Sequence, residues 1–227
     1  MSGGALVTGA ARGLGLEIAR VLARRGLAVH VTDLDPDAAE SAAGELGGEA
    51  FASTLDVRDE QACREAAALT AERAAGRGHV INVVSLAGIV AAPGEAVYGA
   101  SKHAAIAFSL GTLYDLRQAG VKGVDISCVC PDGIWTPMLF DKLDDPAAAA
   151  SFSGVLLKPE QVAEAVGRLV DRPRPVTIVP RRRGPLIRAI DLWPRLGLRM
   201  IGPALAAGRL KQRRMRRKVR RGTLRLR

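Results

Sequence analysis

Residues 5–15, ALVTGAARGLG, decide the fold of this chain. Ala5–Thr8 is an apolar run that predicts a buried strand, and glycines follow at positions 9, 13 and 15. From Leu14 to Arg25 the apolar residues recur with helical spacing, and Gly26 ends that pattern. A glycine-rich turn between a strand and a helix exposes backbone N–H groups at the helix N-terminus, where they can bind phosphate.

The alternation of strand and helix continues along the chain. Further strands are expected at 28–33, 49–55, 79–85, 124–129 and 176–179, and further helices at 36–46, 59–75, 97–119 and 159–171. This alternation predicts an α/β fold with a doubly wound, Rossmann-like parallel sheet covered by helices on both faces. We expect one such domain, spanning residues 1–180.

The charge of the chain is concentrated at its C-terminal end. The 227 residues contain 33 Lys and Arg against 23 Asp and Glu, a net charge of +10. Residues 181–227 hold 17 of the basic residues and one acid, so this segment carries +16 and the first 180 residues carry −6. Its helical periodicity, interrupted by Pro194, predicts a basic, helical extension outside the sheet.

Cysteine usage and hydropathy indicate the compartment. Cys63, Cys128 and Cys130 provide neither a disulfide framework nor the ligand spacing of a metal site. The first residues lack a secretory signal, and no apolar run approaches the roughly 20 residues that a membrane span needs. We therefore expect a cytoplasmic protein without a bound metal.

A second cluster of motif residues lies in the middle of the chain. Ser85 ends an expected strand, and Tyr98 and Lys102 follow early in an expected helix. Residues at i and i+4 share one helix face, so the tyrosine and the lysine point the same way. A free tyrosine has a pKa of about 10, and a nearby ammonium favours its phenolate form. This arrangement is typical of a general acid/base.

Together these motifs resemble the short-chain dehydrogenase/reductase family, whose phosphate loop reads TGxxxGxG. The resemblance runs from the first strand to Val179. It implies an NAD(P)-dependent oxidoreductase that interconverts an alcohol and a ketone or aldehyde by hydride transfer. Tyr98 would exchange the proton, Lys102 would also hold the nicotinamide ribose, and Ser85 would orient the substrate oxygen.

The resemblance also implies a cofactor site. The glycine loop would hold the pyrophosphate, the residues after the third strand would contact adenine, and the loop after the strand at 124–129 would bind the carboxamide. The implied cofactor-binding residues are Thr8, Gly9, Arg12, Gly13, Leu14, Gly15, Asp33, Asp56, Val57, Tyr98, Lys102, Pro131, Gly133 and Thr136. Asp132 departs from the family pattern, in which glycine is usual at this position.

Two residues bear on the choice between NAD and NADP. Asp33 closes the second strand, where a carboxylate can accept both ribose hydroxyls of NAD and repel the 2′-phosphate of NADP. Arg12 favours NADP, because a basic residue before the second glycine often accompanies NADP in the family. We predict NAD as the preferred cofactor, with NADP as the alternative. Two structural alternatives stay open: Asp33 could cap the turn that follows its strand, and Asp56 could cap the next helix.

One segment of the family pattern is absent. Near residues 75–79 the family has a further strand ending in Asn-Asn-Ala-Gly and a long helix, a shortfall of about fifty residues. The lost helix normally carries a catalytic asparagine and part of the dimer interface. Three explanations stay open: a functional minimal enzyme, a catalytically impaired nucleotide-binding or scaffold protein, or a deleted version of an ordinary enzyme.

The sequence leaves several partners open. We expect a small alcohol or carbonyl substrate, in a pocket formed largely by residues 139–157, and consider a homo-oligomer. The basic segment could contact a membrane surface peripherally, remain solvated, or pack beside the substrate pocket. Nucleic acid is disfavoured, because no aromatic residues interleave with the arginines.

Overall fold

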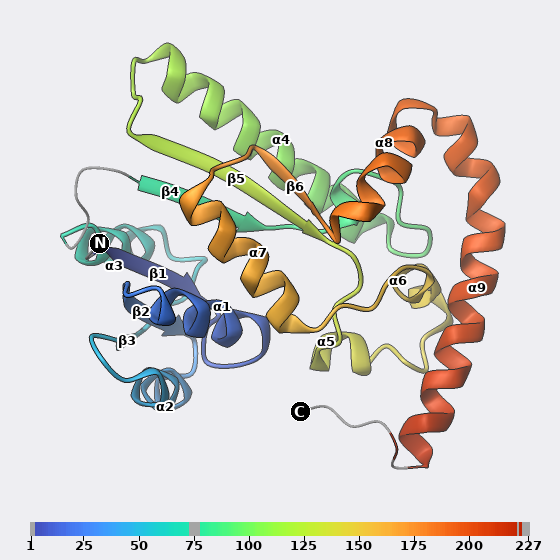
Figure 1. The fold of residues 1–227 in the computed structure, drawn as a ribbon, viewed down its shortest axis with the longest axis horizontal. Coiled ribbons are helices and arrows are strands. Elements are labelled where there is room, and N and C mark those ends of the chain that lie inside the picture. The colour runs from blue at the N-terminus through green and yellow to red at the C-terminus, as the bar shows by residue number, and fades with distance from the viewer. Residues whose placement is uncertain (1–2, 73–77, 222, 224–227) are drawn as a thin grey trace. The chain divides into compact units, whose positions relative to one another are not determined.

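The computed structural model describes residues 3–72, 78–221 and 223. The chain forms two compact units. Unit 1 consists of the chain up to Gly78 together with Pro159–Asp171, and unit 2 of His79–Lys158 with the chain from Arg172 onward. Each unit is built around one three-stranded sheet (Figure 1).

Unit 1 confirms the predicted alternation of strands and helices. Its elements are β1 (Gly4–Thr8), α1 (Gly13–Arg24), β2 (Ala28–Asp33), α2 (Pro36–Leu46), β3 (Phe51–Thr54), α3 (Glu60–Ala71) and α7 (Pro159–Asp171). The strands lie in the order β1-β2-β3 and pair in parallel. The helix expected at 59–75 ends at Ala71, and its last three expected residues lie outside the described part of the chain.

The centre of unit 1 is β2, which is buried on both faces. Val29 and Val31 have no exposed surface, and neither has His30. The imidazole is tolerated there because both ring nitrogens have partners: Nδ1 lies 3.0 Å from Thr70 Oγ1, and Nε2 lies 2.7 Å from Ser53 Oγ. The histidine therefore links the sheet to α3.

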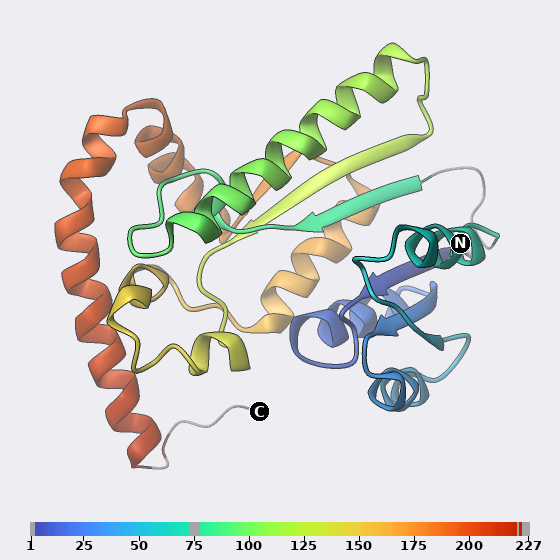
Figure 2. The ribbon, with the colours of Figure 1, turned by 180° about the vertical axis from the view of Figure 1, so that it is seen from behind.

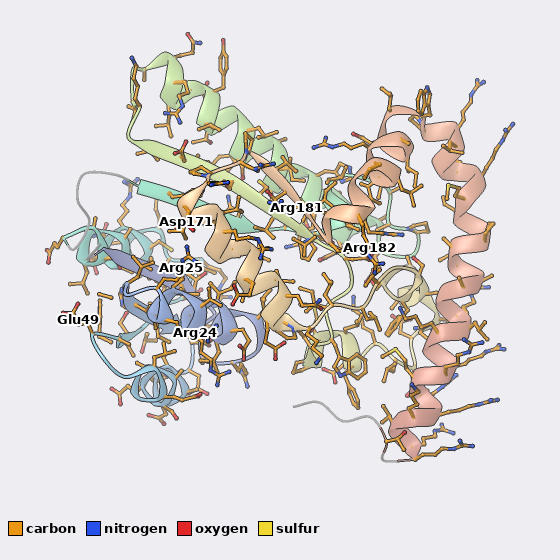
Figure 3. The ribbon with its side chains drawn as sticks, in the orientation of Figure 1. Arg24, Arg25, Glu49, Asp171, Arg181 and Arg182 are labelled. Carbon is orange, nitrogen blue, oxygen red and sulfur yellow. The ribbon has the colours of Figure 1, made fainter. Side chains whose placement is uncertain are left out.

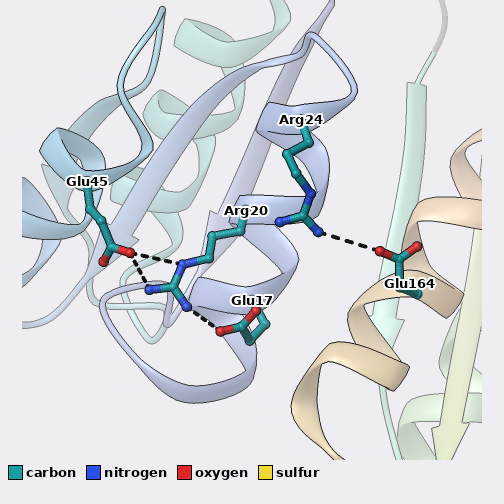
Figure 4. A network of polar contacts seen from close by, with 5 residues as sticks. All are labelled: Glu17, Arg20, Arg24, Glu45 and Glu164. Carbon is teal, nitrogen blue, oxygen red and sulfur yellow. Dashed lines mark hydrogen bonds and ion pairs between the residues drawn. The ribbon is translucent and has the colours of Figure 1, made fainter. Parts of the chain in front are cut away.

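Helix α7 packs closely against α1 within unit 1. Gly167 makes this possible, because a Cβ on it would lie 2.7 Å from Val21 Cγ1. At the rim, Arg25 pairs with Asp171, and Arg24 Nη2 lies 3.5 Å from Glu164 Oε1 (Figures 3 and 4).

Ion pairs also join α1 to α2. Arg20 pairs with Glu17 on its own helix and donates from Nε to Glu45 Oε1 at 3.1 Å (Figure 4). Because these side chains stay partly open to solvent, such pairs contribute little to the free energy of folding. The apolar side chains between the helices and the sheet supply most of the stability of this unit.

Unit 2 holds the second sheet and the C-terminal helices. Its elements are β4 (Gly78–Val83), η1 (Leu86–Gly88), α4 (Ala96–Gln118), β5 (Val124–Pro131), α5 (Pro137–Phe140), η2 (Pro146–Ala148), α6 (Ala149–Ser153), β6 (Val176–Val179), η3 (Arg181–Arg183), α8 (Gly184–Leu192) and α9 (Pro194–Arg220). The strand order is β4-β5-β6, and β5 and β6 are parallel. The β4 and β5 arrows also point the same way in both views (Figures 1 and 2). Cys128, Val129 and Cys130 of β5 are fully buried.

Each sheet has at its edge a strand that would neighbour the absent strand in the sheet of the family. β1 is an edge strand of the first sheet, and β4 is an edge strand of the second. In a doubly wound sheet of order 3-2-1-4-5-6, the absent strand would be the fourth, beside β1. The parallel, Rossmann-like α/β class is confirmed, while its strands are divided between two hydrogen-bonded sheets. Residues 75–77 of the junction lie outside the described residues.

The segment after β6 is more regular than predicted. Pro194 does interrupt the helical pattern, but only as the first residue of α9, which then continues through Pro203 to Arg220. Residues 139–157, the predicted substrate segment, contain two short helical segments, η2 and α6. None of the described helices is long and apolar enough to cross a bilayer. The domain boundary at residue 180 stays a prediction.

We predict that Gly167→Leu lowers the free energy of unfolding by about 1–3 kcal/mol, because the new side chain must displace Val21 at the α1–α7 contact. The matched control is Gly44→Leu on α2, where an added Cβ meets nothing within 4 Å. That change should be neutral or stabilise by up to about 1 kcal/mol. Urea titration followed by circular dichroism measures both, and equal effects would contradict the packing argument.

Candidate active site

The glycine loop of unit 1 has the geometry of a phosphate cradle. Gly9 and Gly13 adopt φ of 62° and 59°, a left-handed conformation that other residues rarely take. A Cβ on Gly15 would lie 2.0 Å from the carbonyl oxygen of Gly9, so only glycine lets α1 start this close to the loop. The backbone after β1, from Thr8 to Leu14, therefore fits a pyrophosphate at the N-terminus of α1.

Asp33 lies beside this loop. Its Oδ2 accepts a hydrogen bond from Ala11 N at 3.2 Å, while its contact with Asp35 N is longer, at 3.4 Å. The residue that caps α2 is Asp35, which accepts from Ala38 N. Arg12 stands at the N-cap of α1 with its side chain exposed. The structure thus brings both residues that bear on cofactor choice to the glycine loop.

Asp56 and Val57 follow β3 with different surroundings. The Asp56 carboxylate accepts from Arg58 Nη2 at 2.6 Å and from Arg58 N at 2.9 Å, and these hydrogen bonds lower its pKa to about 2. The N-cap of α3 is Asp59. Asp56 is therefore not the helix cap, and an adenine amine would have to compete with the Arg58 side chain for it. Val57 is exposed.

Unit 2 holds the predicted acid/base residues. Ser85 caps η1, where its Oγ accepts from Ala87 N at 3.1 Å. Because the oxygen serves as acceptor in that bond, its own hydrogen is free to be donated to a substrate oxygen. Tyr98 lies in the first turn of α4 with 36% of its surface exposed, and Lys102 Nζ is 5.4 Å from its ring centroid.

The turn η1 packs closely on α4. A Cβ on Gly88 would lie 2.8 Å from the carbonyl oxygen of Lys102, and one on Gly99 would lie 3.6 Å from that of Ala87. The turn after Ser85 therefore rests on the part of α4 that carries Lys102. Such an approach requires glycine at position 88, since two of the three nearest atoms belong to the backbone of Lys102.

A second lysine approaches Tyr98, and sequence reasoning missed it. Lys142, which follows α5, has its Nζ 5.8 Å from the Tyr98 ring centroid. Its ammonium pairs with Glu95, which also accepts from Ser151 Oγ at 2.7 Å. These residues are far apart in the sequence and belong to no shared motif, so only the fold brings them together. They tie the 139–157 segment to the start of α4.

The loop after β5 contains Pro131, Gly133 and Thr136, the three residues implied to contact nicotinamide. Pro131 ends the strand, and Thr136 is the N-cap of α5. A Cβ on Gly133 would lie 2.4 Å from Ser151 O, so this position accepts only glycine. The loop thereby packs against α6.

Asp132, the departure from the family pattern, has a clear structural role. Its Oδ1 accepts from Gly133 N at 3.0 Å, and its Oδ2 accepts from Val155 N at 2.9 Å. The same Oδ2 lies 3.1 Å from Arg183 Nε of η3. The carboxylate is nearly buried, and it joins the loop after β5 to the segment before α7 and to the C-terminal extension.

Helix α9 packs on the same region, lying alongside α6 (Figures 1 and 2). The buried Gln212 donates from Nε2 to Asp145 O at 2.9 Å, and Lys211 Nζ donates to Gly154 O at 2.7 Å. Burial lowers the pKa of Lys211. Met215 and Val219 pack against an apolar cluster formed by Leu139, Leu143, Ala148 and Phe152. Part of the basic extension therefore covers the predicted substrate segment.

The thiol of Cys130, at the end of β5, is unsuited to redox chemistry. Burial, followed by the neighbouring Cys128, raises the pKa of the Cys130 thiol to about 12. A thiol with this pKa stays protonated at neutral pH and is a poor nucleophile.

Comparison with known proteins identifies the family. A family model described as short chain dehydrogenase matches residues 4–77 and 66–147, more than half of the chain. The chain therefore belongs to the short-chain dehydrogenase family of oxidoreductases. The two matching stretches overlap at residues 66–77, where the sequence lacks the further strand and long helix of the family.

Two curated relatives have comparable identity. Cyclopentanol dehydrogenase of Comamonas sp. (strain NCIMB 9872) is 29% identical, over 73% of this chain and 88% of its own length. The 1-deoxy-11-beta-hydroxypentalenate dehydrogenase of Streptomyces exfoliatus is also 29% identical, over 60% of this chain and 68% of its own. The first alignment runs over 223 positions although it takes in only 73% of this chain, so the relative has residues without a counterpart here.

A solved structure has the same fold. A point variant of actinorhodin polyketide ketoreductase, crystallised with NADPH, aligns with a TM-score of 0.67 and 24% identity. The alignment covers 78% of this chain and 95% of the ketoreductase chain.

We predict that Asp132→Asn lowers the free energy of unfolding by about 1–3 kcal/mol, because Arg183 loses its nearly buried ion-pair partner and Val155 N loses a charged acceptor. The control Asp144→Asn removes an exposed carboxylate that pairs with Arg216, and it should cost no more than about 0.5 kcal/mol. Asp132→Gly, which introduces the usual family residue, should be more destabilising than Asp132→Asn. A stability equal to that of the parent chain would refute this role of Asp132.

Proposed function

We propose that this protein interconverts an alcohol and a ketone or aldehyde with NAD(P) as the hydride carrier. The observation that carries the proposal is the cluster in unit 2. Tyr98 is partly exposed on α4, Lys102 Nζ lies 5.4 Å from its ring, and the Ser85 turn packs on the same helix. Curated relatives named as dehydrogenases of an alcohol support the same reaction class.

The chain's own residues would move and hold the proton. Tyr98 acts as general base when it takes the proton of an alcohol, and as general acid in the reverse direction. The ammonium of Lys102 stabilises the phenolate, and Lys142 adds a second positive charge near the ring. Ser85 donates its hydroxyl hydrogen to the substrate oxygen and so orients it. The nicotinamide, when bound, accepts or supplies the hydride.

The cofactor would be held mainly by the glycine loop. Thr8, Gly9, Gly13, Leu14 and Gly15 present the cradle that fits a pyrophosphate. We propose a preference for NAD, because the Asp33 carboxylate lies beside this loop and would repel a 2′-phosphate. Arg12 keeps NADP as the alternative. The other proposed cofactor-binding residues are Asp56, Val57, Pro131, Gly133 and Thr136.

The rival proposal is a catalytically impaired member of the family that binds a nucleotide or serves as a scaffold. It is favoured by one fact, the absence of the strand and helix that normally bring the fourth catalytic residue. The intact Ser85, Tyr98 and Lys102 favour the enzyme.

The decisive experiment compares Tyr98→Phe with Tyr114→Phe, an exposed tyrosine on the same helix. Substrates would be cycloalkanols and the corresponding ketones, each with NAD or NADP, and NAD(P)H absorbance would report turnover. We expect Tyr98→Phe to lower kcat by about 10²–10⁴-fold while Tyr114→Phe keeps parental activity. NAD binding should be retained in both variants.

Turnover with unchanged kcat in Tyr98→Phe would eliminate the proposed acid/base role. Binding of NAD without turnover of any substrate by the parent chain would favour the rival. Asp33→Ala tests the cofactor preference separately, since it should narrow the difference in KM between NAD and NADP.

We also propose that α4 joins two copies of the chain. One face of this helix exposes the apolar side chains of Val97, Ala104 and Phe108, which lie within about 40° of one another around the helix axis. An exposed patch of this kind commonly marks an interface. Phe108→Glu should shift the elution volume in size-exclusion chromatography to that of a monomer, while Leu69→Glu, on α3, should not. A parent chain that is already monomeric would overturn the proposal.

The proposed location is the cytoplasm, consistent with three unpaired cysteines. The proposed partners include a membrane surface, which the basic extension would contact peripherally.

A further inference from the structure

Helix α9 carries charge of one sign only. Between Pro194 and Arg220 it contains eight arginines and two lysines and no acidic residue. Like charges at helical spacing repel one another, so this composition costs stability in an isolated helix. An anionic partner would remove that cost.

One face of α9 is already occupied. Gly208 lies against α6, where a Cβ would fall 1.9 Å from Ala149 O, and Gln212 donates to carbonyl groups of the segment before α6. Met215 and Val219 continue this face into the apolar cluster below α5. The helix is therefore anchored and presents a defined outward side.

The outward side is a stripe of arginines. Successive residues of a helix are rotated by about 100°, which places six arginines within one sector that is turned away from the anchored face. We call this sector the arginine face, and its members are Arg195, Arg199, Arg209, Arg213, Arg217 and Arg220. All six are exposed, and none forms an ion pair with another described residue. Nitrogen-tipped side chains project from both ends of α9 in Figure 3.

Large apolar side chains accompany the arginine face at its N-terminal end. Leu192 and Trp193, at the turn between α8 and α9, are 69% and 59% exposed, and Leu198 is 66% exposed. Leu210 lies among the arginines and is also exposed. Such side chains have no stabilising role in water, but they gain free energy when they enter the boundary between lipid headgroups and acyl chains.

We propose that the arginine face and the Leu192–Trp193 turn dock α9 on a bilayer of anionic phospholipids. The arginines would bind lipid phosphates, and Trp193 with Leu198 would insert at the level of the headgroups. This inference deepens the membrane contact named under the proposed function. It rests on that contact alone and not on turnover, because vesicle binding is measured without substrate or cofactor.

Lipid fits these observations better than nucleic acid. Proteins that bind single strands interleave aromatic side chains with basic ones so that bases can stack, and α9 contains no aromatic residue. A stripe that mixes arginine with exposed leucine instead suits an interface with a charged outer layer and an apolar interior.

The test measures binding of the full-length protein to vesicles by flotation. We expect binding to phosphatidylglycerol vesicles and little binding to phosphatidylcholine vesicles. The variant Arg209→Gln/Arg213→Gln/Arg217→Gln should weaken partitioning by about a hundredfold, at roughly fivefold for each arginine near an anionic surface. The control Arg24→Gln/Arg64→Gln/Arg172→Gln removes the same charge from exposed arginines outside α9 and should bind nearly as the parent does.

Tryptophan fluorescence reports the turn directly. Phosphatidylglycerol vesicles should shift the emission of the parent protein to the blue, and Trp193→Phe should abolish that shift. Equal losses in the two triple variants would show a net-charge effect and overturn the proposal. So would tighter binding to duplex DNA than to phosphatidylglycerol vesicles, with the same dependence on Arg209, Arg213 and Arg217. Loss of turnover in a variant that still floats with vesicles would concern the enzyme and not this surface.

Discussion

The candidate chemistry depends on one close approach, that of η1 to the helix that follows it. Gly88 faces the carbonyl oxygen of Lys102, and a Cβ at position 88 would lie 2.8 Å from that oxygen. This contact places the turn that begins at Ser85 against the part of α4 that carries Tyr98 and Lys102. A β-strand, a short turn and a helix thereby place the Ser85 turn against the helix that carries Lys102, although the serine and the lysine lie seventeen positions apart. Larger residues at the contact would separate them, because backbone atoms have little room to yield.

The C-terminal extension is part of the same architecture. Its charge marks it as an appendage in the sequence, yet Arg183 pairs with Asp132, and Gln212 binds carbonyl groups in the segment that also carries Lys142. Lys142 in turn pairs with Glu95 and approaches the Tyr98 ring. A chain of contacts thus runs from α9 to the tyrosine. The outward face of that helix keeps its arginines free for an external partner, so one helix both supports the substrate segment and presents charge.

Local sequence signals predicted well those elements whose structure depends on residues close together in the chain. Periodicity located α7 and β6 at their observed bounds, and three glycines located the tight turn between β1 and α1. From the sequence, Asp132 could be recognised only as a departure from the family pattern. Its structural role stayed hidden because its partners Val155 and Arg183 lie far along the chain. Lys142 gave no signal, since a lone lysine in an Ala- and Asp-rich segment is ordinary. The sequence predicted a basic helical segment but not that α9 continues through Pro203, because a proline usually ends a helix.

The sequence by itself determined the family, the α/β alternation and the identity of the acid/base candidates, because each depends on residue type at short, regular spacing. Only the tertiary structure decided which strands pair, which groups surround Tyr98 and which side of α9 remains exposed. Those outcomes depend on contacts between residues tens of positions apart, whose free energies come from packing and desolvation. The absent strand illustrates the difference. Its loss is visible in the sequence as a gap, but the division of the strands into β1-β2-β3 and β4-β5-β6 follows from hydrogen bonding between strands, which no local pattern encodes.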